Sequence, residues 1–67
     1  MAIKNLTYKV TTTIGGWIVD VGQHHYYSDA IYAAQQLSKV AKDVPFRIYR
    51  WTKDHEWVQE SYYINGE

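Results

Sequence analysis

The residues of this chain most able to do acid–base or metal chemistry are its histidines and the acids beside one of them. His24 and His25 are adjacent, and His55 lies between Asp54 and Glu56. Neighbouring residues of a strand point to opposite faces, so the adjacent pair cannot bind one metal ion unless the chain turns there. The charged triplet around His55 is typical of a solvated turn, and there is no cysteine to complete a zinc site. We therefore predict no metal site and no cofactor, although a pH-sensitive contact is within the chemistry of these imidazoles.

Residues arranged for nucleophilic catalysis are equally scarce. The serines Ser28, Ser38 and Ser61 have no recognisable arrangement with a histidine and an acid. The sequence also has no G-x-S-x-G, P-loop or H-E-x-x-H motif, the patterns that place a nucleophile, a phosphate or a zinc ion. A chain of 67 residues has little room for a pocket of about 300 Å³. We therefore expect a protein that is not an enzyme.

Aromatic side chains are the feature of the sequence best suited to binding another molecule. There are seven Tyr, three Trp and one Phe, and in the run from Phe46 to Trp51 alternation puts Arg47, Tyr49 and Trp51 on one side. Trp57, on the following strand, is expected beside them. Tyr, Trp and Arg dominate protein-binding hot spots. The alternatives are that these residues stack single-stranded bases, that they only stabilise a small sheet by cross-strand pairing, or that they form a homodimer seam.

The elements that would position these aromatics begin with a hairpin. Residues 6–14 alternate apolar and polar side chains, as a half-buried strand does, and Gly15–Gly16 can supply the positive φ of a two-residue turn. Residues 17–21 form the returning strand. Nearly every apolar residue of the hairpin then lies on one face, which specifies the register. The predicted cross-strand pairs are Ile14 with Trp17, Thr12 with Val19, and Val10 with Val21.

A helix is predicted over residues 29–43. Ser28 is its expected N-cap, and Pro45 prevents its continuation. The apolar stripe, at the spacing of one helix face, comprises Ala30, Ile31, Ala33, Ala34, Leu37, Val40 and Ala41. The solvent-facing side is a second candidate partner-binding surface, made up of Tyr32, Gln36, Lys39 and Lys42.

A second hairpin, over residues 46–52 and 57–64, has two compatible registers. A two- or four-residue loop would put on one face Phe46, Ile48, Arg50, Thr52, Trp57, Gln59, Ser61 and Tyr63. The other face would then hold Arg47, Tyr49, Trp51, Val58, Glu60, Tyr62 and Ile64. A three-residue loop would instead gather Phe46, Ile48, Val58, Tyr62 and Ile64 on one face with Arg50 and Glu60, and Arg47, Tyr49, Trp51, Trp57, Gln59, Ser61 and Tyr63 on the other. We favour the three-residue loop because its core face is more apolar.

These elements predict a single α+β domain over residues 1–67, with ββαββ order. The simplest packing is a four-stranded antiparallel sheet with the one helix on one face. A single helix cannot cover both faces, so the second face meets water or a partner. We expect Tyr8, Trp17, Phe46 and Tyr62 beneath the helix, and Tyr49, Trp51, Trp57 and Tyr63 on the uncovered face.

Charge and hydropathy narrow the partners and the location. Seven basic and seven acidic residues balance, so no overall field favours nucleic acid or anionic lipid. Residues 39–53 hold five bases and one acid, a local charge of +4, whereas residues 54–67 hold four acids and no base. A hairpin that pairs the two segments would neutralise most of both charges. No apolar run approaches the ~20 residues of a membrane span, and residues 1–4 lack the apolar core of a signal peptide. We therefore predict a cytoplasmic protein with no membrane contact.

Part of the chain resembles a family of DNA-binding domains. Residues 16–21 (GWIVDV), followed by residues 26–30 (YYSDA) at the start of a helix, are similar to the strand–strand–helix signature of arm-type domains of phage integrases and related plant domains. Those domains lay a three-stranded sheet in the major groove. The resemblance implies that this chain binds DNA or RNA through its sheet, or through the basic segment 39–53.

The plan of the whole chain is similar to that of small α+β proteins that phages encode against host defences, including anti-CRISPR proteins. The run FRIYRW at residues 46–51 and the EWV at residues 56–58 look like their second hairpin. The resemblance implies inhibition of a host protein or nucleoprotein complex by steric occlusion. We favour this interpretation because the charge is balanced. The predicted contacts are Arg47, Tyr49, Trp51 and Trp57. The second predicted surface, which we call the helix set, consists of Tyr32, Gln36, Lys39 and Lys42.

Overall fold

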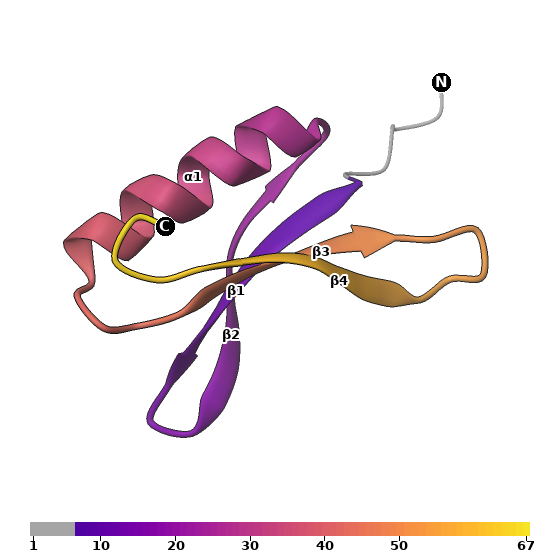
Figure 1. The fold of residues 1–67 in the computed structure, drawn as a ribbon. Helices are drawn as coiled ribbons and strands as arrows, with labels where there is room; N and C mark the ends of the chain where they lie inside the picture. Colours follow the sequence, from indigo (N-terminus) through magenta and orange to yellow (C-terminus); the bar gives the residue numbers. More distant parts are fainter. Residues whose placement is uncertain (1–6) are drawn as a thin grey trace.

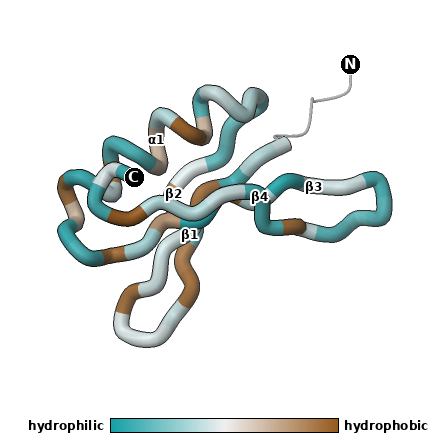
Figure 2. Tube along the Cα trace, viewed as in Figure 1, coloured by the Kyte–Doolittle hydropathy of each residue, from teal (hydrophilic) through white to brown (hydrophobic). Residues whose placement is uncertain are grey.

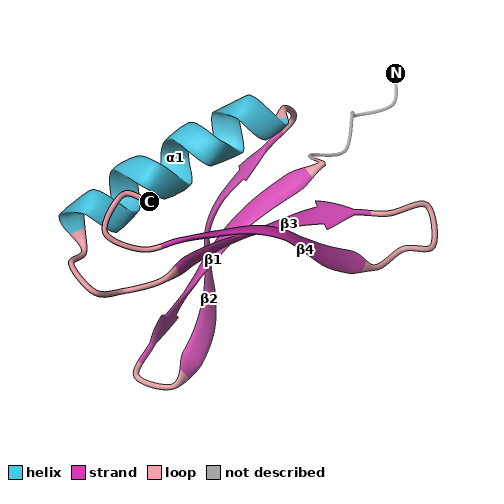
Figure 3. Cartoon of the chain, in the orientation of Figure 1, coloured by secondary structure: helices cyan, strands magenta, loops and turns pink. Residues whose placement is uncertain are grey.

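The computed structural model describes residues 7–67 and contains one sheet and one helix (Figure 1). In chain order the elements are β1 (Tyr8–Ile14), β2 (Trp17–His24), α1 (Tyr27–Val40), β3 (Phe46–Trp51) and β4 (Trp57–Tyr63). All neighbouring strands are antiparallel, in the order β2-β1-β3-β4. The two hairpins therefore join through the pairing of β1 with β3, and the predicted four-stranded ββαββ fold is confirmed (Figure 3).

The first hairpin turns at the two glycines, as predicted. Gly15 and Gly16 have φ of +57° and +86°, values that glycine adopts without a steric penalty. The predicted pairs of Ile14 with Trp17 and of Thr12 with Val19 are confirmed. The predicted pair of Val10 with Val21 is wrong.

A β-bulge causes that error. The register of β1 against β2 shifts between Val10 and Thr11, so Val10 pairs with Gly22 and Thr11 pairs with Asp20. Val21 is the extra residue and has no partner on β1. Beyond the bulge, each residue of β2 pairs one position later than in a regular ladder. Tyr8, for example, lies opposite His24 instead of Gln23.

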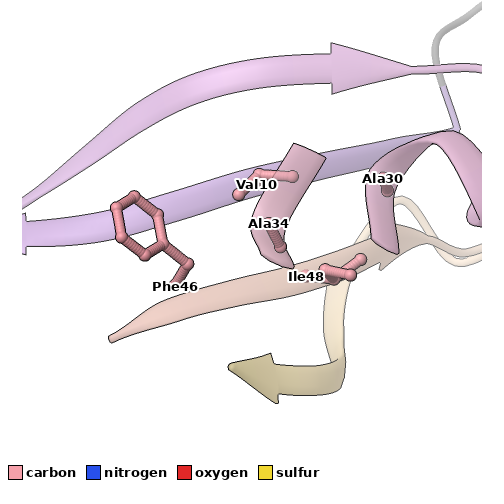
Figure 4. Packing of buried hydrophobic residues seen from close by; sticks show 5 residues of the cluster. All are labelled: Val10, Ala30, Ala34, Phe46 and Ile48. Carbon is pink, nitrogen blue, oxygen red and sulfur yellow. The ribbon is translucent and has the colours of Figure 1, made fainter. Parts of the chain in front are cut away.

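Helix α1 packs on the sheet through its smallest side chains. Ala30 and Ala34 are fully buried and form one core cluster with Val10, Phe46 and Ile48 (Figure 4). Residues four apart lie on the same side of a helix, and short alanine side chains let the helix lie close to the strands. The core is therefore formed by the helix, β1 and β3.

The predicted helix boundaries are wrong at both ends. The helix begins at Tyr27, and its N-cap is Tyr26, which makes no side-chain cap, rather than Ser28. Tyr27 belongs to the helix because of tertiary contacts: its ring centroid lies 5.2 Å from that of Tyr8, and its hydroxyl shares a hydrogen bond with Ser61 Oγ. At the other end the helix stops at Val40.

The apolar stripe of the helix is also narrower than predicted. Leu37 and Val40 are exposed, whereas Ser38 is fully buried. Ser38 Oγ donates to the Gln35 carbonyl at 2.9 Å and accepts from the Gly66 amide at 2.8 Å. The C-terminal residues therefore dock against the helix. They are anchored by a serine four residues after Ala34, which lies on the buried side of the helix but was left out of the predicted stripe because it is polar.

The C-terminal segment is fixed at a second point. The Asp43 amide donates to Asn65 Oδ1 at 2.8 Å, and the Asn65 side-chain amide donates to Asp43 Oδ1 at 3.0 Å. Both residues have positive φ, 64° and 54°. This reciprocal pair joins the turn after α1 to the turn after β4, in agreement with the position of the C-terminus beside the helix in Figure 1.

The second hairpin has the favoured three-residue loop. Trp51 pairs with Trp57, the Thr52 amide donates to the Glu56 carbonyl at 2.9 Å, and His55 adopts φ +61°. A bulge then follows, because Ile48 pairs with Ser61 while Tyr49 pairs with Gln59. Glu60 is the extra residue.

This bulge reverses the predicted positions of two tyrosines. Tyr63 pairs with Phe46 and packs against the core, although it was expected on the uncovered face. Tyr62 pairs with Arg47 on the other face, although it was expected beneath the helix. An extra residue changes the side of every position beyond it, since side chains alternate with a period of two.

Trp17 was also expected beneath the helix, and it is exposed. A helix of 14 residues is about 21 Å long, and the turn of the β1–β2 hairpin points away from it (Figure 1). The apolar residues near this turn, coloured as hydrophobic segments on both strands in Figure 2, therefore lie outside the core.

Candidate functional site

The sheet register brings the four predicted sheet residues onto one surface. Phe46 and Ile48 point toward the helix, so the alternate residues of β3, which are Arg47, Tyr49 and Trp51, point to the opposite side. Trp57 lies directly across from Trp51 on β4. We call this surface, together with the facing residues of β1 and β2, the open face.

Strand β1 adds a cation to the open face that the aromatic pattern alone did not single out. Lys9 pairs with Tyr49, and its Nζ lies 4.5 Å from the Trp57 ring centroid and 5.8 Å from that of Tyr49. The same Nζ is 3.8 Å from Asp20 Oδ1. An ammonium over aromatic rings is attracted by their negative faces, so Lys9 holds rings from β3 and β4 together.

Arg47 forms a second cation–ring contact. Its guanidinium carbon lies 5.7 Å from the Tyr62 ring centroid, and Nη1 donates to Thr13 Oγ1 at 3.4 Å. Arg47 forms no ion pair with any residue in the range 7–67. Tyr62 joins this group only because of the bulge at Glu60. No signal in the sequence marks that bulge, so the register that we favoured placed Tyr62 beneath the helix, although the two- or four-residue loop would have placed it beside Arg47.

The two tryptophans form an aromatic cluster at the outer end of the second hairpin. The Trp51 and Trp57 rings lie 5.0 Å apart at 57°, and the His55 ring lies 5.8 Å from Trp51 at 73°. Tilted and edge-on contacts of this kind stabilise a hairpin beyond their buried area. These rings therefore have a structural role in addition to any contact with a partner.

The middle of the open face is a closed layer of side chains. Thr11, which lies between Lys9 and Thr13 on β1 and opposite Arg47, is 1% exposed. Its hydroxyl has no hydrogen-bond partner. Lys9, Thr13 and Arg47 beside it are half-buried, whereas Asp20, its partner on β2, is exposed. The open face therefore covers Thr11 and presents rings and cations from paired strands.

The charged segments of the second hairpin meet as expected. Arg50 Nε and Glu60 Oε2 are 2.6 Å apart, in a pair whose side chains remain partly exposed. The positive charge of β3 is thus partly neutralised by β4. Arg47 and Lys9 remain the cations of the open face.

The helix set lies on the other side of the molecule. Tyr32, Gln36 and Lys39 are exposed on α1, and α1 covers the sheet face opposite the open face. Lys42 lies in the turn after the helix rather than on it. The structure therefore does not bring these four residues together with the sheet residues, and a single flat partner surface cannot contact both sets.

Each of the three histidines has a different neighbour in the structure. His24 pairs with Tyr8 at the edge of the sheet, His25 contacts Tyr26, and His55 contacts Trp51. Within residues 7–67, no group of three His, Cys, Asp or Glu side chains is placed to hold a metal ion. The prediction that the chain has no metal site stays a prediction.

Comparisons with known proteins give no match. No family model, no curated protein and no solved structure is similar enough to this chain to be significant. The function must therefore be argued from the open face itself.

In the described part of the chain, no helix combines the length and the apolar composition that crossing a membrane would require.

Proposed function

We propose that this chain is a non-enzymatic binding protein that covers a surface of a partner protein with its open face. The proposal is carried by one observation: Arg47, Tyr49, Trp51 and Trp57 converge on the face of the sheet that the helix leaves uncovered. These residue types supply most of the binding energy in protein interfaces. Because they project from paired strands rather than from loops, little ordering entropy is lost when they bind.

The chemistry of the open face indicates what the partner presents. Among the described residues the Arg47 guanidinium forms a hydrogen bond with a hydroxyl and a contact with a ring, but no ion pair. A carboxylate of the partner could therefore form a charge-assisted hydrogen bond there. The Trp51–Trp57 pair, at the outer end of the same face, suits an apolar side chain. We therefore propose a partner with an acidic residue beside an apolar one.

Steric occlusion is the proposed mode of action. A chain of 67 residues that buries a standard interface of about 800 Å² per partner would block whatever else uses that surface. The similarity of plan to phage-encoded inhibitors supports a host protein or nucleoprotein complex as the partner. Binding would be stoichiometric, and no step of the mechanism requires bond chemistry.

Binding of single-stranded nucleic acid is the competing function. It is favoured by the two cations that lie among the rings, Lys9 and Arg47, since base stacking and phosphate contacts use the same residue types. The balanced charge of the chain disfavours it, because phosphate neutralisation supplies most of the affinity of such proteins. Electrophoretic mobility shifts at two salt concentrations separate the functions: tight binding with a steep salt dependence would overturn the protein-partner proposal.

Capture from a bacterial host lysate, followed by mass spectrometry, tests the proposal directly. The wild type should retain a protein that Arg47→Ala loses, because the substitution removes the guanidinium without disturbing the core. Tyr32→Ala is the matched control on the exposed side of α1 and should retain the same protein. If Tyr32→Ala loses the partner while Arg47→Ala keeps it, the helix set is the binding surface and the proposal is wrong.

A further inference from the structure

Strand β2 leaves an unpaired edge on the sheet. It lies outermost in the order β2-β1-β3-β4, and every second residue of such a strand points its backbone N–H and C=O away from its neighbour. Proteins usually protect an edge of this kind with charged side chains, proline or a β-bulge. In β2 the charge of Asp20 and the bulge at Val21 lie in the second half of the strand, whereas Trp17–Val19 has no such protection and pairs regularly with β1.

Apolar side chains on this edge remain exposed. Trp17 is 74% exposed and Ile18 is 71% exposed, and Val19 and Ile14 are exposed as well. Ile14 belongs to β1 and lies across from Trp17, whereas Trp17, Ile18 and Val19 are consecutive on β2. Single exposed apolar residues are ordinary, but three in succession on an edge strand are typical of an interaction surface. Folding of one copy does not bury these side chains, so their burial requires a partner.

The charges on the two edge strands indicate which edge can pair with the same edge of a second copy. The other edge, β4, begins just after Glu56 and carries Glu60, so self-pairing there would bring acids together. Strand β2 has one charged residue, Asp20, and its carboxylate already lies 3.8 Å from Lys9 Nζ of the same copy. Strand β2 is therefore the edge whose charge pattern allows a second copy of this chain.

We propose that β2 pairs antiparallel with β2 of a second copy, centred on Ile18. In this register Ile18 faces Ile18 of the second copy, and Trp17 faces Val19 of the second copy. Asp20 faces Gly16 of the second copy, which keeps the two carboxylates apart. The interface is self-complementary, as a two-fold dimer requires, and it buries the exposed apolar residues on both sides of the strand.

The resulting dimer has a continuous sheet through both copies. The two-fold axis of such a pairing is perpendicular to the sheet, so both open faces lie on the same side. This arrangement differs from a homodimer built across the aromatic face, because it leaves Arg47, Trp51 and Trp57 free. The inference does not rest on the proposed function, since it uses none of the four sheet residues assigned to partner binding. Ile18 lies on the same side of the sheet as these residues, opposite Thr13, but at the far edge.

Sedimentation equilibrium over a range of concentrations tests the proposal. The wild type should approach twice its mass of 7.9 kDa as the concentration rises. Ile18→Lys should remain monomeric at the same concentrations, because it places two ammonium groups face to face at the centre of the pairing. Val40→Lys is the control, since Val40 is 85% exposed on α1, and it should dimerise like the wild type. A wild type that is monomeric throughout, or an Ile18→Lys variant that still dimerises, would overturn the proposal.

Disulfide trapping gives a second test that does not depend on a disruptive substitution. The chain has no cysteine, so Ile18→Cys introduces a single thiol. Facing residues of antiparallel strands have Cα atoms about 4.5–5.5 Å apart, within the range of a disulfide. Mild oxidation should therefore cross-link Ile18→Cys rapidly, whereas Val58→Cys, on the β4 edge, should stay monomeric. Faster cross-linking of Val58→Cys would show that the wrong edge has been chosen.

Discussion

Two neighbouring threonines of β1 should respond in opposite directions to the same substitution. Thr11 is 1% exposed and its hydroxyl has no hydrogen-bond partner. A buried polar group left unpaired costs about 1–3 kcal/mol of stability. Thr11→Val keeps the β-branched shape and replaces that hydroxyl with a methyl group. We expect it to raise the free energy of unfolding by about 1 kcal/mol, and therefore to raise Tm by roughly 4–8 °C in a domain of this size.

Thr12→Val is the matched control. Thr12 is 2% exposed, but its hydroxyl donates to the Pro45 carbonyl at 2.8 Å. The substitution removes a satisfied hydrogen bond and leaves that carbonyl without its donor, so we expect a loss of about 1 kcal/mol. The two variants make the same substitution on the same strand at sites that are both buried. Thr11 lies on the open face and Thr12 on the side of the helix, and the difference that sets the expected sign is whether the hydroxyl is paired.

Thermal and urea unfolding, followed by tryptophan fluorescence, measure both changes. A higher Tm for Thr11→Val and a lower Tm for Thr12→Val would show that the open face closes over Thr11. A loss of stability in Thr11→Val comparable to that in Thr12→Val would refute the reasoning. In that case the Thr11 hydroxyl has a partner such as water, and the layer formed by Lys9, Arg47 and their rings is not closed.

Three further substitutions probe the core, the tail and the surface charges. Ile48→Ala should destabilise the domain by about 2–5 kcal/mol, measured by urea unfolding, because Ile48 is fully buried between helix and sheet. Gly66→Ala should lower Tm, since Gly66 has φ +86° and an added Cβ would lie 2.8 Å from Lys39 Cγ; an unchanged Tm would mean that the tail does not dock on α1. Glu60→Gln should change the free energy of unfolding by less than about 1 kcal/mol, because the ion pair of Glu60 with Arg50 is partly exposed. Urea unfolding at low and high salt concentration measures this change.

The order of the elements and the loops of both hairpins could be predicted because local chemistry determines them. The Gly15–Gly16 turn and the alternation of β1 fixed one register near the turn, and the more apolar core face selected the three-residue loop of the other hairpin. Arg47, Tyr49 and Trp51 could likewise be assigned to one face, since alternation along a single unbroken strand is sufficient for that.

Two bulges that the predicted registers did not include account for the errors in the site. Glycine inside a strand often marks a bulge, so Gly22, next to Val21, is a signal that the predicted register did not use. Nothing in the residues around Glu60 distinguishes a bulge from a regular ladder, because a bulge is set by how whole strands twist against each other. The bulge at Glu60 moved Tyr62 to the open face and Tyr63 to the core. Alternation in the sequence therefore assigns side chains to the correct face of the sheet only as far as the first bulge.

The length of the helix accounts for the error at Trp17. Pattern analysis assigned Trp17 to the face beneath the helix, and Ile14, Trp17 and Val19 do form cross-strand neighbours on one side of the hairpin. Whether that side is buried depends on how far α1 reaches, which is a tertiary property. The helix ends before the hairpin turn, and the residues left exposed there are the ones that we propose pair with a second copy.

The most direct test of the account is an NMR titration of the labelled protein with its captured partner, followed through the indole N–H signals. The chain has three tryptophans, and they lie on two surfaces: Trp51 and Trp57 are on the open face, and Trp17 is at the edge of β2. We predict that the Trp51 and Trp57 signals shift or broaden on binding while that of Trp17 does not. A response at Trp17 alone, or changes confined to the backbone amides around Tyr32 and Gln36, would contradict the claim that the open face is the binding surface.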